Sequence, residues 1–188
     1  MRARPGVLAS LLATLLPLVA ASCGGGGGGG PTTPPPPTKT VIVFTPATGG
    51  SPGVSLAPGA SADSSTLVLE VHDNGVTGLY GLAFNLTYPN TVLHFTGASE
   101  GAVLNGGGIA TSLQVAESPA GTLVVGLTRL GGVPGTSTSG VLLTLRFSAV
   151  ASGSGSFAFT HTQAVGAAGA TLSGLSWTAG TVQVTVSP

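Results

Sequence analysis

The sequence predicts an all-β fold for residues 41–188, an antiparallel sandwich of about nine strands. Apolar residues in this region recur with a period of two, which is typical of half-buried strands and not of helices. Glycine, proline and asparagine punctuate these segments as turn signals. Val, Thr, Ser and Gly are abundant, whereas the helix-favouring Lys, Glu, Gln and Arg are scarce. Short strands separated by such turns are characteristic of β-sandwiches.

The strands follow from the alternation in chain order. Leucine and valine occupy alternate positions in residues 67–71, and aromatic residues and leucine occupy alternate positions in residues 80–88. The same alternation recurs in residues 143–149 with Leu and Phe and in residues 182–186 with Val. The turn signals between strands are Pro58-Gly59, Asp73-Asn74-Gly75, Pro89-Asn90, Asn105-Gly106, Pro119-Ala120-Gly121, Pro134-Gly135 and Ser152-Gly153. The predicted inward residues are Tyr80, Leu82, Phe84, Leu86, Tyr88, Val92, Phe95, Leu123, Val125, Leu127, Leu143, Leu145, Phe147, Phe157 and Phe159.

The first 22 residues read as an export signal. Arg2 and Arg4 give a positive start, an uncharged apolar stretch follows, and small residues lead into Cys23. Cys23 is the single cysteine of the chain, so it cannot form an internal disulfide. The segment resembles a bacterial lipoprotein signal, which implies that Cys23 is the lipid anchor. The alternative is an ordinary secretory signal followed by an unrelated cysteine.

Residues 23–40 are expected to form a tether between this anchor and the folded domain. Seven glycines are followed by a proline-rich stretch, and neither composition can bury enough apolar surface to fold. A spacer is useful where its start is fixed, so the order of segments favours a lipid-anchored protein of the bacterial cell envelope. The resemblance further implies the outer membrane, because Gly24 stands where inner-membrane lipoproteins often carry aspartate.

The charged residues argue against nucleic acid as a partner. Only 5% of the chain is charged, and without the signal three basic residues face five acidic ones, a net charge of 3 − 5 = −2. No basic stripe exists that could follow a phosphate backbone. The mature surface is therefore expected to consist mainly of Ser, Thr, Gly and Ala.

The sequence offers no convincing catalytic or metal-binding group, and we expect neither an enzyme nor a cofactor. Gly97-Ala98-Ser99-Glu100-Gly101 matches the serine-nucleophile pattern, but that pattern requires a strand, a sharp turn and a helix, and here a loop between strands is expected. His72 is expected at the edge of a turn and His94 on a strand surface, with no metal-binding histidine pair. The five acids are scattered over the sequence.

The order of the strand segments resembles that of a cohesin domain, the receptor module of bacterial cellulose-degrading assemblies. The resemblance covers about residues 40–186 and is carried by four stretches. These are Gly81-Leu82-Ala83-Phe84-Asn85-Leu86-Thr87-Tyr88-Pro89-Asn90-Thr91-Val92-Leu93, Gly121-Thr122-Leu123-Val124-Val125-Gly126-Leu127, Gly140-Val141-Leu142-Leu143-Thr144-Leu145-Arg146-Phe147 and Gly180-Thr181-Val182-Gln183-Val184. It implies a nine-stranded jelly-roll sandwich, in agreement with the strand pattern.

The same resemblance implies a protein partner, because cohesins bind dockerins, the small calcium-loop modules of polysaccharide-degrading enzymes. Dockerins bind one outward sheet face, which implies a partner-binding face formed here by Asn85, Thr87, Gln114, Thr128 and Thr160. For each of these residues the alternative is ordinary solvated strand surface.

Two other functions remain open. Cohesins share their sandwich fold with carbohydrate-binding modules, and sugar rings stack on exposed aromatic side chains. Trp177 is the single tryptophan and the candidate sugar contact, provided that it is exposed and not packed into the sandwich. The third function is a structural or adhesive surface protein that associates through sheet edges.

Overall fold

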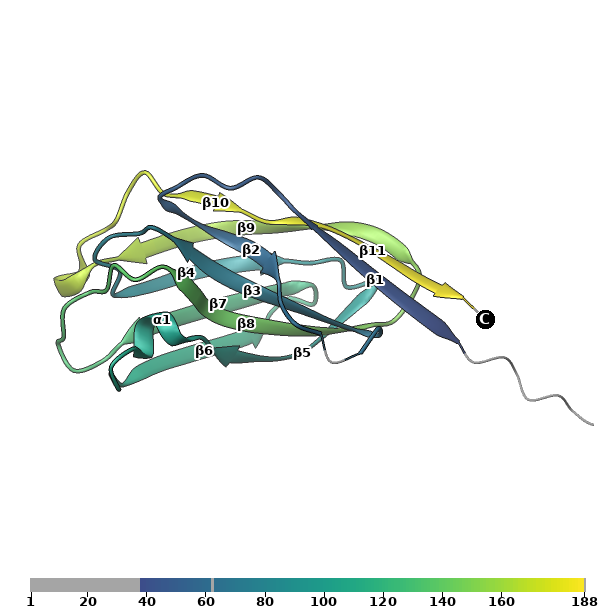
Figure 1. Cartoon of the computed structure of the whole chain (residues 1–188), viewed down its shortest axis with the longest axis horizontal. Coiled ribbons are helices and arrows are strands. Elements are labelled where there is room, and N and C mark those ends of the chain that lie inside the picture. The colour runs from purple at the N-terminus through teal and green to yellow at the C-terminus, as the bar shows by residue number, and fades with distance from the viewer. Residues whose placement is uncertain (1–37, 62, 188) are drawn as a thin grey trace, which may run out of the picture. The chain divides into compact units, whose positions relative to one another are not determined.

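The computed structural model describes residues 38–61 and 63–187, which form a two-layered β-sandwich (Figure 1). Its strands are β1 (Lys39–Pro46), β2 (Gly53–Pro58), β3 (Thr66–Asn74), β4 (Gly81–Thr87), β5 (Leu93–Glu100), β6 (Thr111–Glu117), β7 (Thr122–Arg129), β8 (Gly140–Ala149), β9 (Gly153–Val165), β10 (Ser176–Thr178) and β11 (Gly180–Ser187). A one-turn helix, α1 (Ala102–Asn105), and a 3-10 turn, η1 (Ala167–Gly169), lie between strands.

The strands form a six-stranded sheet, β1-β11-β9-β4-β7-β6, and a five-stranded sheet, β10-β2-β3-β8-β5. All strand pairs are antiparallel except β10 and β2, which run parallel. The predicted all-β sandwich is confirmed, but the predicted count of nine strands is wrong, because the described residues form eleven. A three-residue strand such as β10 is too short to display an alternation of apolar and polar residues, so pattern reading misses it.

The core lies between the two sheets, and the alternation in sequence produces it directly. Phe84 on β4 and Phe147 on β8 are almost fully buried, as are the leucine and valine residues that alternate along β3, β7 and β8. Most predicted inward residues are buried. Tyr80, Phe95 and Phe159 are only half-buried; Tyr80 precedes the first residue of β4, and Phe95 lies on the edge strand β5, where less of the facing sheet covers it.

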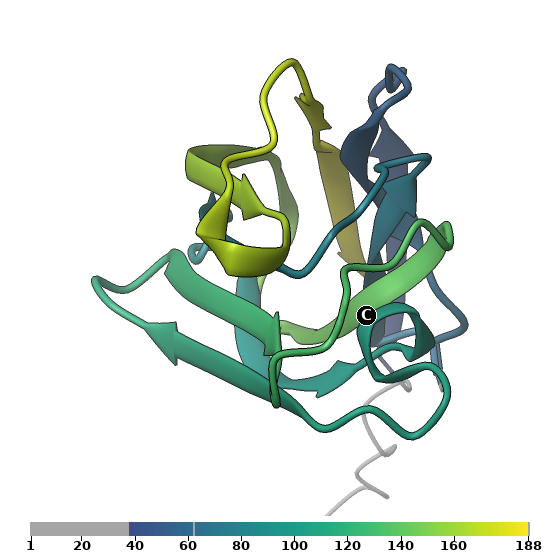
Figure 2. The ribbon, with the colours of Figure 1, turned by 90° about the vertical axis from the view of Figure 1, so that its left-hand side faces the viewer.

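One end of the sandwich is closed by α1 and the loop between β7 and β8, as the end-on view shows (Figure 2). That loop is fixed to the segment before β4, because Leu79 and Thr136 exchange two backbone hydrogen bonds of 2.7 and 2.8 Å. Ser137 and Ser139 add side-chain bonds to the backbone N–H groups of Gly78 and Gly75. The loop is thus held by the fold at several points.

Two local predictions are wrong. The Gly97–Gly101 segment is not a loop, because residues up to Glu100 belong to β5, and the Ser99 hydroxyl accepts a hydrogen bond from Arg146 at 3.1 Å. His72 is not at a turn edge but inside β3, since that strand continues to Asn74. His94 lies on the exposed surface of β5, as predicted.

The predicted signal, Cys23 and nearly all of the tether lie outside the described residues. The first strand, β1, pairs along its whole length with the last strand, β11, from Lys39 opposite Ser187 to Pro46 opposite Gly180. None of the helices in the described ranges has the length and apolar character needed to span a bilayer.

Candidate functional site

The candidate site is the outward face of four adjacent strands, β9, β4, β7 and β6, in the six-stranded sheet. The alternation along each strand separates this face from the core. On β7, Leu123, Val125 and Leu127 are buried, so Val124 and Gly126 point to the opposite side of the sheet. The same rule directs the polar positions of β4 outward between its buried Leu and Phe residues.

The five predicted face residues lie on this face together. Asn85 on β4 is opposite Thr160 on β9, Gln114 on β6 is opposite Gly126 on β7, and Thr128 on β7 is opposite Gly81 on β4. Thr87 lies at the end of β4, opposite Thr122 and Ala158. Gln114 and Thr160 are exposed, whereas Asn85, Thr87 and Thr128 are half-buried by their cross-strand neighbours. The role of these five residues in binding stays a prediction.

A shallow trough of about 250 Å³ crosses this face. Gly81, Ala83 and Gly126 form its floor, and Gln114, Thr128 and Gln163 are among its walls. The trough exists because these central positions carry no side chain or only a methyl group. A Cβ added at Gly126 would meet no atom within 4 Å, so the space above this residue is open to solvent. A partner could therefore insert larger side chains between the polar walls.

A β-bulge on β9 is a feature of this face that sequence reasoning missed. Ala83 pairs with Gln163 but Asn85 pairs with Thr160, so two residues of β9 stand opposite one residue of β4. The extra residue places His161 at a φ of 50°, an uncommon conformation for a residue other than glycine. Asn85 Nδ2 donates a hydrogen bond of 3.3 Å to Nδ1 of the exposed His161. Bulges of this kind re-aim side chains and are frequent near functional sites.

Val124 is a second residue of the face that was missed. Its side chain is 43% exposed although it lies in the middle of β7, between buried neighbours. It stands in register with Asn85 on one side and Ala116 on the other, next to the trough. A valine at an outward position between two inward apolar residues was the available signal. Isolated apolar residues on a polar face supply the buried centre of many interfaces.

One end of the face is anchored by a hydrogen-bonded carboxylate. The Tyr88 hydroxyl donates to Oε1 of Glu117, which also accepts the Gly121 N–H at 2.8 Å. Burial of the phenol, together with the hydrogen bond and charge of Glu117, raises the pKa of Tyr88 to about 12. The same hydrogen bonds lower the pKa of the Glu117 carboxyl. This contact joins the β6–β7 hairpin to the end of β4 and so fixes the relation of three strands of the face.

Trp177, the candidate sugar contact, lies on β10 in the other sheet. Its indole packs on Phe84 and Phe159, with ring centroids 5.8 and 5.4 Å apart, and the side chain is half-buried. The ring therefore belongs to the aromatic packing between the sheets. This leaves sugar stacking without the fully exposed indole on which that alternative depended.

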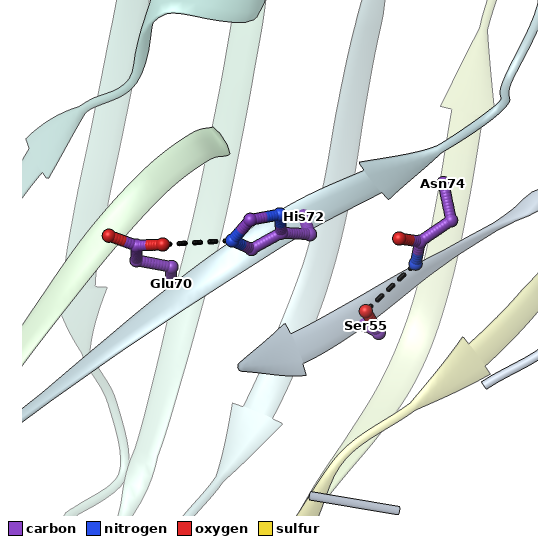
Figure 3. A network of polar contacts seen from close by, with 4 residues as sticks. All are labelled: Ser55, Glu70, His72 and Asn74. Atoms are coloured by element: carbon purple, nitrogen blue, oxygen red, sulfur yellow. Dashed lines mark hydrogen bonds and ion pairs between the residues drawn. The ribbon is translucent and has the colours of Figure 1, made fainter. Parts of the chain in front are cut away.

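The outward face of the five-stranded sheet carries a small polar network (Figure 3). His72 Nε2 and Glu70 Oε2, two residues apart on β3, lie 2.8 Å apart in a hydrogen bond, and Asn74 Nδ2 donates to the Ser55 hydroxyl at 2.8 Å. The side chains of Glu70 and His72 are each 29% exposed, and partly solvated contacts of this kind contribute little to stability. Within the described ranges, no cluster of three or more His, Cys, Asp or Glu side chains could hold a metal ion.

Comparison with known proteins identifies the fold. No protein-family model matches the sequence, and no curated protein matches it. Solved structures do match. A cohesin from scaffoldin B of Acetivibrio cellulolyticus, solved in complex with a mutant Cel5 dockerin, is 18% identical with a TM-score of 0.52, covering 68% of this chain and 97% of that one.

Two further structures agree with this match. A type II cohesin, in a cohesin–X–dockerin complex from Acetivibrio cellulolyticus, is 15% identical with a TM-score of 0.55, covering 75% of this chain and 96% of that one. A type I cohesin–dockerin complex from Clostridium thermocellum matches with 13% identity and a TM-score of 0.52, covering 68% and 98%. At these identities the likeness establishes the fold, and the described domain is a β-sandwich of the cohesin fold.

Proposed function

We propose that this domain is a recognition module that binds a protein partner through the outward face of β9, β4, β7 and β6. The observation that carries the proposal is the trough over Gly81, Ala83 and Gly126 on β4 and β7, bordered by polar side chains of β6, β7 and β9. Such a surface offers shape and hydrogen bonds for docking. The structurally similar cohesins were solved in complexes with dockerins, which supports a dockerin-like module as the partner.

The chemistry of the face indicates what the partner must supply. Val124 offers an exposed apolar contact, and Asn85 and Gln114 offer amide donors and acceptors. Because the floor of the trough consists of small residues, the larger anchoring side chains have to come from the partner. A partner helix that places bulky apolar residues in the trough and polar residues along its walls would satisfy both requirements.

The proposal is tested by calorimetric titration of the protein with a panel of type I and type II dockerin modules in calcium. We expect one class to bind, and Gly126→Arg to abolish that binding, because Arg would fill the trough without a clash at its Cβ. Gln183→Arg is the matched control, since Gln183 lies exposed on β11 of the same sheet, away from the trough. Retention on insoluble polysaccharide with no dockerin bound, or equal binding by both variants, would contradict the proposal.

We also propose that the module is displayed from the cell envelope, with the outer membrane as its site and a lipidated Cys23 as its anchor. The order of apolar leader, cysteine, glycine- and proline-rich segment and domain supports this. One acyl chain anchors only weakly, so several chains on Cys23 would be needed. Metabolic labelling with a radioactive fatty acid should label the wild type and leave Cys23→Ala unlabelled; an unlabelled wild type would exclude the anchor.

A further inference from the structure

A buried arginine at one end of the sandwich has no role in the proposed docking face. Arg129, the last residue of β7, is only 9% exposed, and its Nε is buried with no hydrogen-bond partner among the residues that the structure describes. A guanidinium stays charged at all physiological pH values and carries five donors in a planar fork. Burying such a group without a partner is unfavourable, so it marks a site that a ligand can complete.

No acidic side chain of the protein forms an ion pair with Arg129. The chain has five acids, and all of them lie in the described ranges. Glu70 is hydrogen-bonded to His72, and Asp63 and Glu117 are bound by Ser65 and Tyr88. Asp73 accepts the Val76 N–H at 2.8 Å and Glu100 accepts the Thr111 hydroxyl at 2.7 Å. The second carboxylate oxygen of each is buried without a hydrogen-bond partner among the described residues, and neither carboxylate forms an ion pair with Arg129.

Arg129 lines a hollow of about 340 Å³ between α1 and the β7–β8 loop, at the end of the sandwich seen in Figure 2. Val103, Ile109, Val133 and Pro134 supply apolar walls, and Thr136 and Thr138 supply hydroxyls. The walls are held in place, because Thr136 is bonded through its backbone to Leu79 and Val103 is buried in the core. The volume is within the usual range for small-molecule sites.

We propose that this hollow binds a small organic monocarboxylate, with the carboxylate on the guanidinium of Arg129 and the organic part against the apolar wall. A carboxylate matches the planar fork of arginine with two parallel hydrogen bonds. Arg129 is the single charged residue among the described residues that line the hollow, so one negative charge balances it and a doubly charged phosphate exceeds it. The Thr136 hydroxyl donates to the Thr138 hydroxyl and accepts the Thr138 N–H, each at 3.2 Å, so the Thr138 hydroxyl is the one that can donate to a polar substituent.

The test is calorimetric titration of the full chain with three probes: sodium hexanoate, sodium galacturonate and sodium phosphate. We expect a carboxylate to bind and phosphate to bind more weakly. Hexanoate as the tighter probe assigns the site to aliphatic acids, and galacturonate as the tighter probe assigns it to uronic acids. Arg129→Met should weaken the carboxylate by about tenfold to a hundredfold, and Arg129→Lys, which keeps the charge but not the fork, should be intermediate.

Stability separates a binding role for Arg129 from a structural one. Without ligand, Arg129→Met should melt at the same temperature as the wild type or higher, because it removes a buried, unpaired charge. Glu100→Gln should retain the wild-type affinity for the carboxylate. The proposal is overturned if no carboxylate binds, if phosphate binds more tightly than the carboxylates, or if Arg129→Met binds the carboxylate as tightly as the wild type. It is also overturned if Arg129→Met and Glu100→Gln both lower the melting temperature, because that result would show that these two side chains stabilise each other in the fold.

Discussion

Replacing Gly126 by threonine should stabilise the fold and weaken partner binding at the same time. Glycine in a strand interior is less favourable than alanine by roughly 0.5–1 kcal/mol, because it loses more backbone freedom on folding. At Gly126 nothing opposes this gain, since an added Cβ meets no atom within 4 Å. We therefore expect the free energy of unfolding to rise by about 0.5–1 kcal/mol and the melting temperature by about 1–4 °C.

Urea unfolding followed by Trp177 fluorescence measures the stability, and titration with the dockerin that the wild type binds measures the affinity. Gly81→Thr is the matched control. A Cβ at Gly81 would approach Thr128 Oγ1 to 2.8 Å and the Leu127 carbonyl oxygen to 3.1 Å, so this variant should lose stability. The reasoning is refuted if Gly126→Thr lowers the free energy of unfolding, or if it raises that free energy and leaves the affinity for the partner unchanged.

Four other perturbations test the packing and the polar groups. Phe84→Ala should lower the free energy of unfolding by about 3–5 kcal/mol and shift the fluorescence of Trp177 to longer wavelength, because it opens a void beside that indole. Burial raises the pKa of Asp73 in the folded protein, so the stability of the wild type should fall as the pH rises from the pKa of Asp73 in the unfolded chain to its pKa in the folded one. Melting curves of Asp73→Asn should lack this fall, and the variant should have a higher melting temperature than the wild type at neutral pH. Hydrogen bonds from Ser65 lower the pKa of Asp63, so this carboxylate stabilises the fold at neutral pH and its stabilisation is lost as the pH falls through the folded pKa. Melting curves of Asp63→Asn should therefore lack this loss at acid pH and show a lower melting temperature than the wild type at neutral pH. Ultraviolet titration should show one phenol ionising near pH 12 that is absent from Tyr88→Phe, and an unchanged titration in that variant would contradict the buried hydrogen bond.

The sequence predicted the sandwich, because a period of two assigns each strand residue to one side of its sheet. The resemblance to cohesins named Asn85, Gln114 and Thr128 as one face, and the strand register places them on the same side of the sheet, while their role in binding stays a prediction. The trough and the bulge at His161 could not be predicted in the same way. Both depend on which residues of neighbouring strands stand opposite one another, and that register is set by turns and bulges far from either residue.

Arg129 shows a different limit of sequence reasoning. The alternation of Leu123, Val125 and Leu127 already places Arg129 on the inward side of β7. A charged side chain at the end of a strand normally reaches solvent, so a place on the inward side of the alternation does not by itself indicate burial. Here α1 and the β7–β8 loop lie at the end of the sheet beside Arg129, and only their folded arrangement shows that most of this side chain, including Nε, is buried.

The pairing of Lys39 with Ser187 has a practical consequence for how the domain can be held. Whatever precedes the first strand and whatever follows the last one depart from neighbouring points, and Figure 1 shows α1 toward the other end of the sandwich. A support coupled beside Lys39 or Ser187 is therefore attached at the end of the domain opposite α1. Coupling at that end, through either strand, holds the described domain with its α1 end directed away from the support.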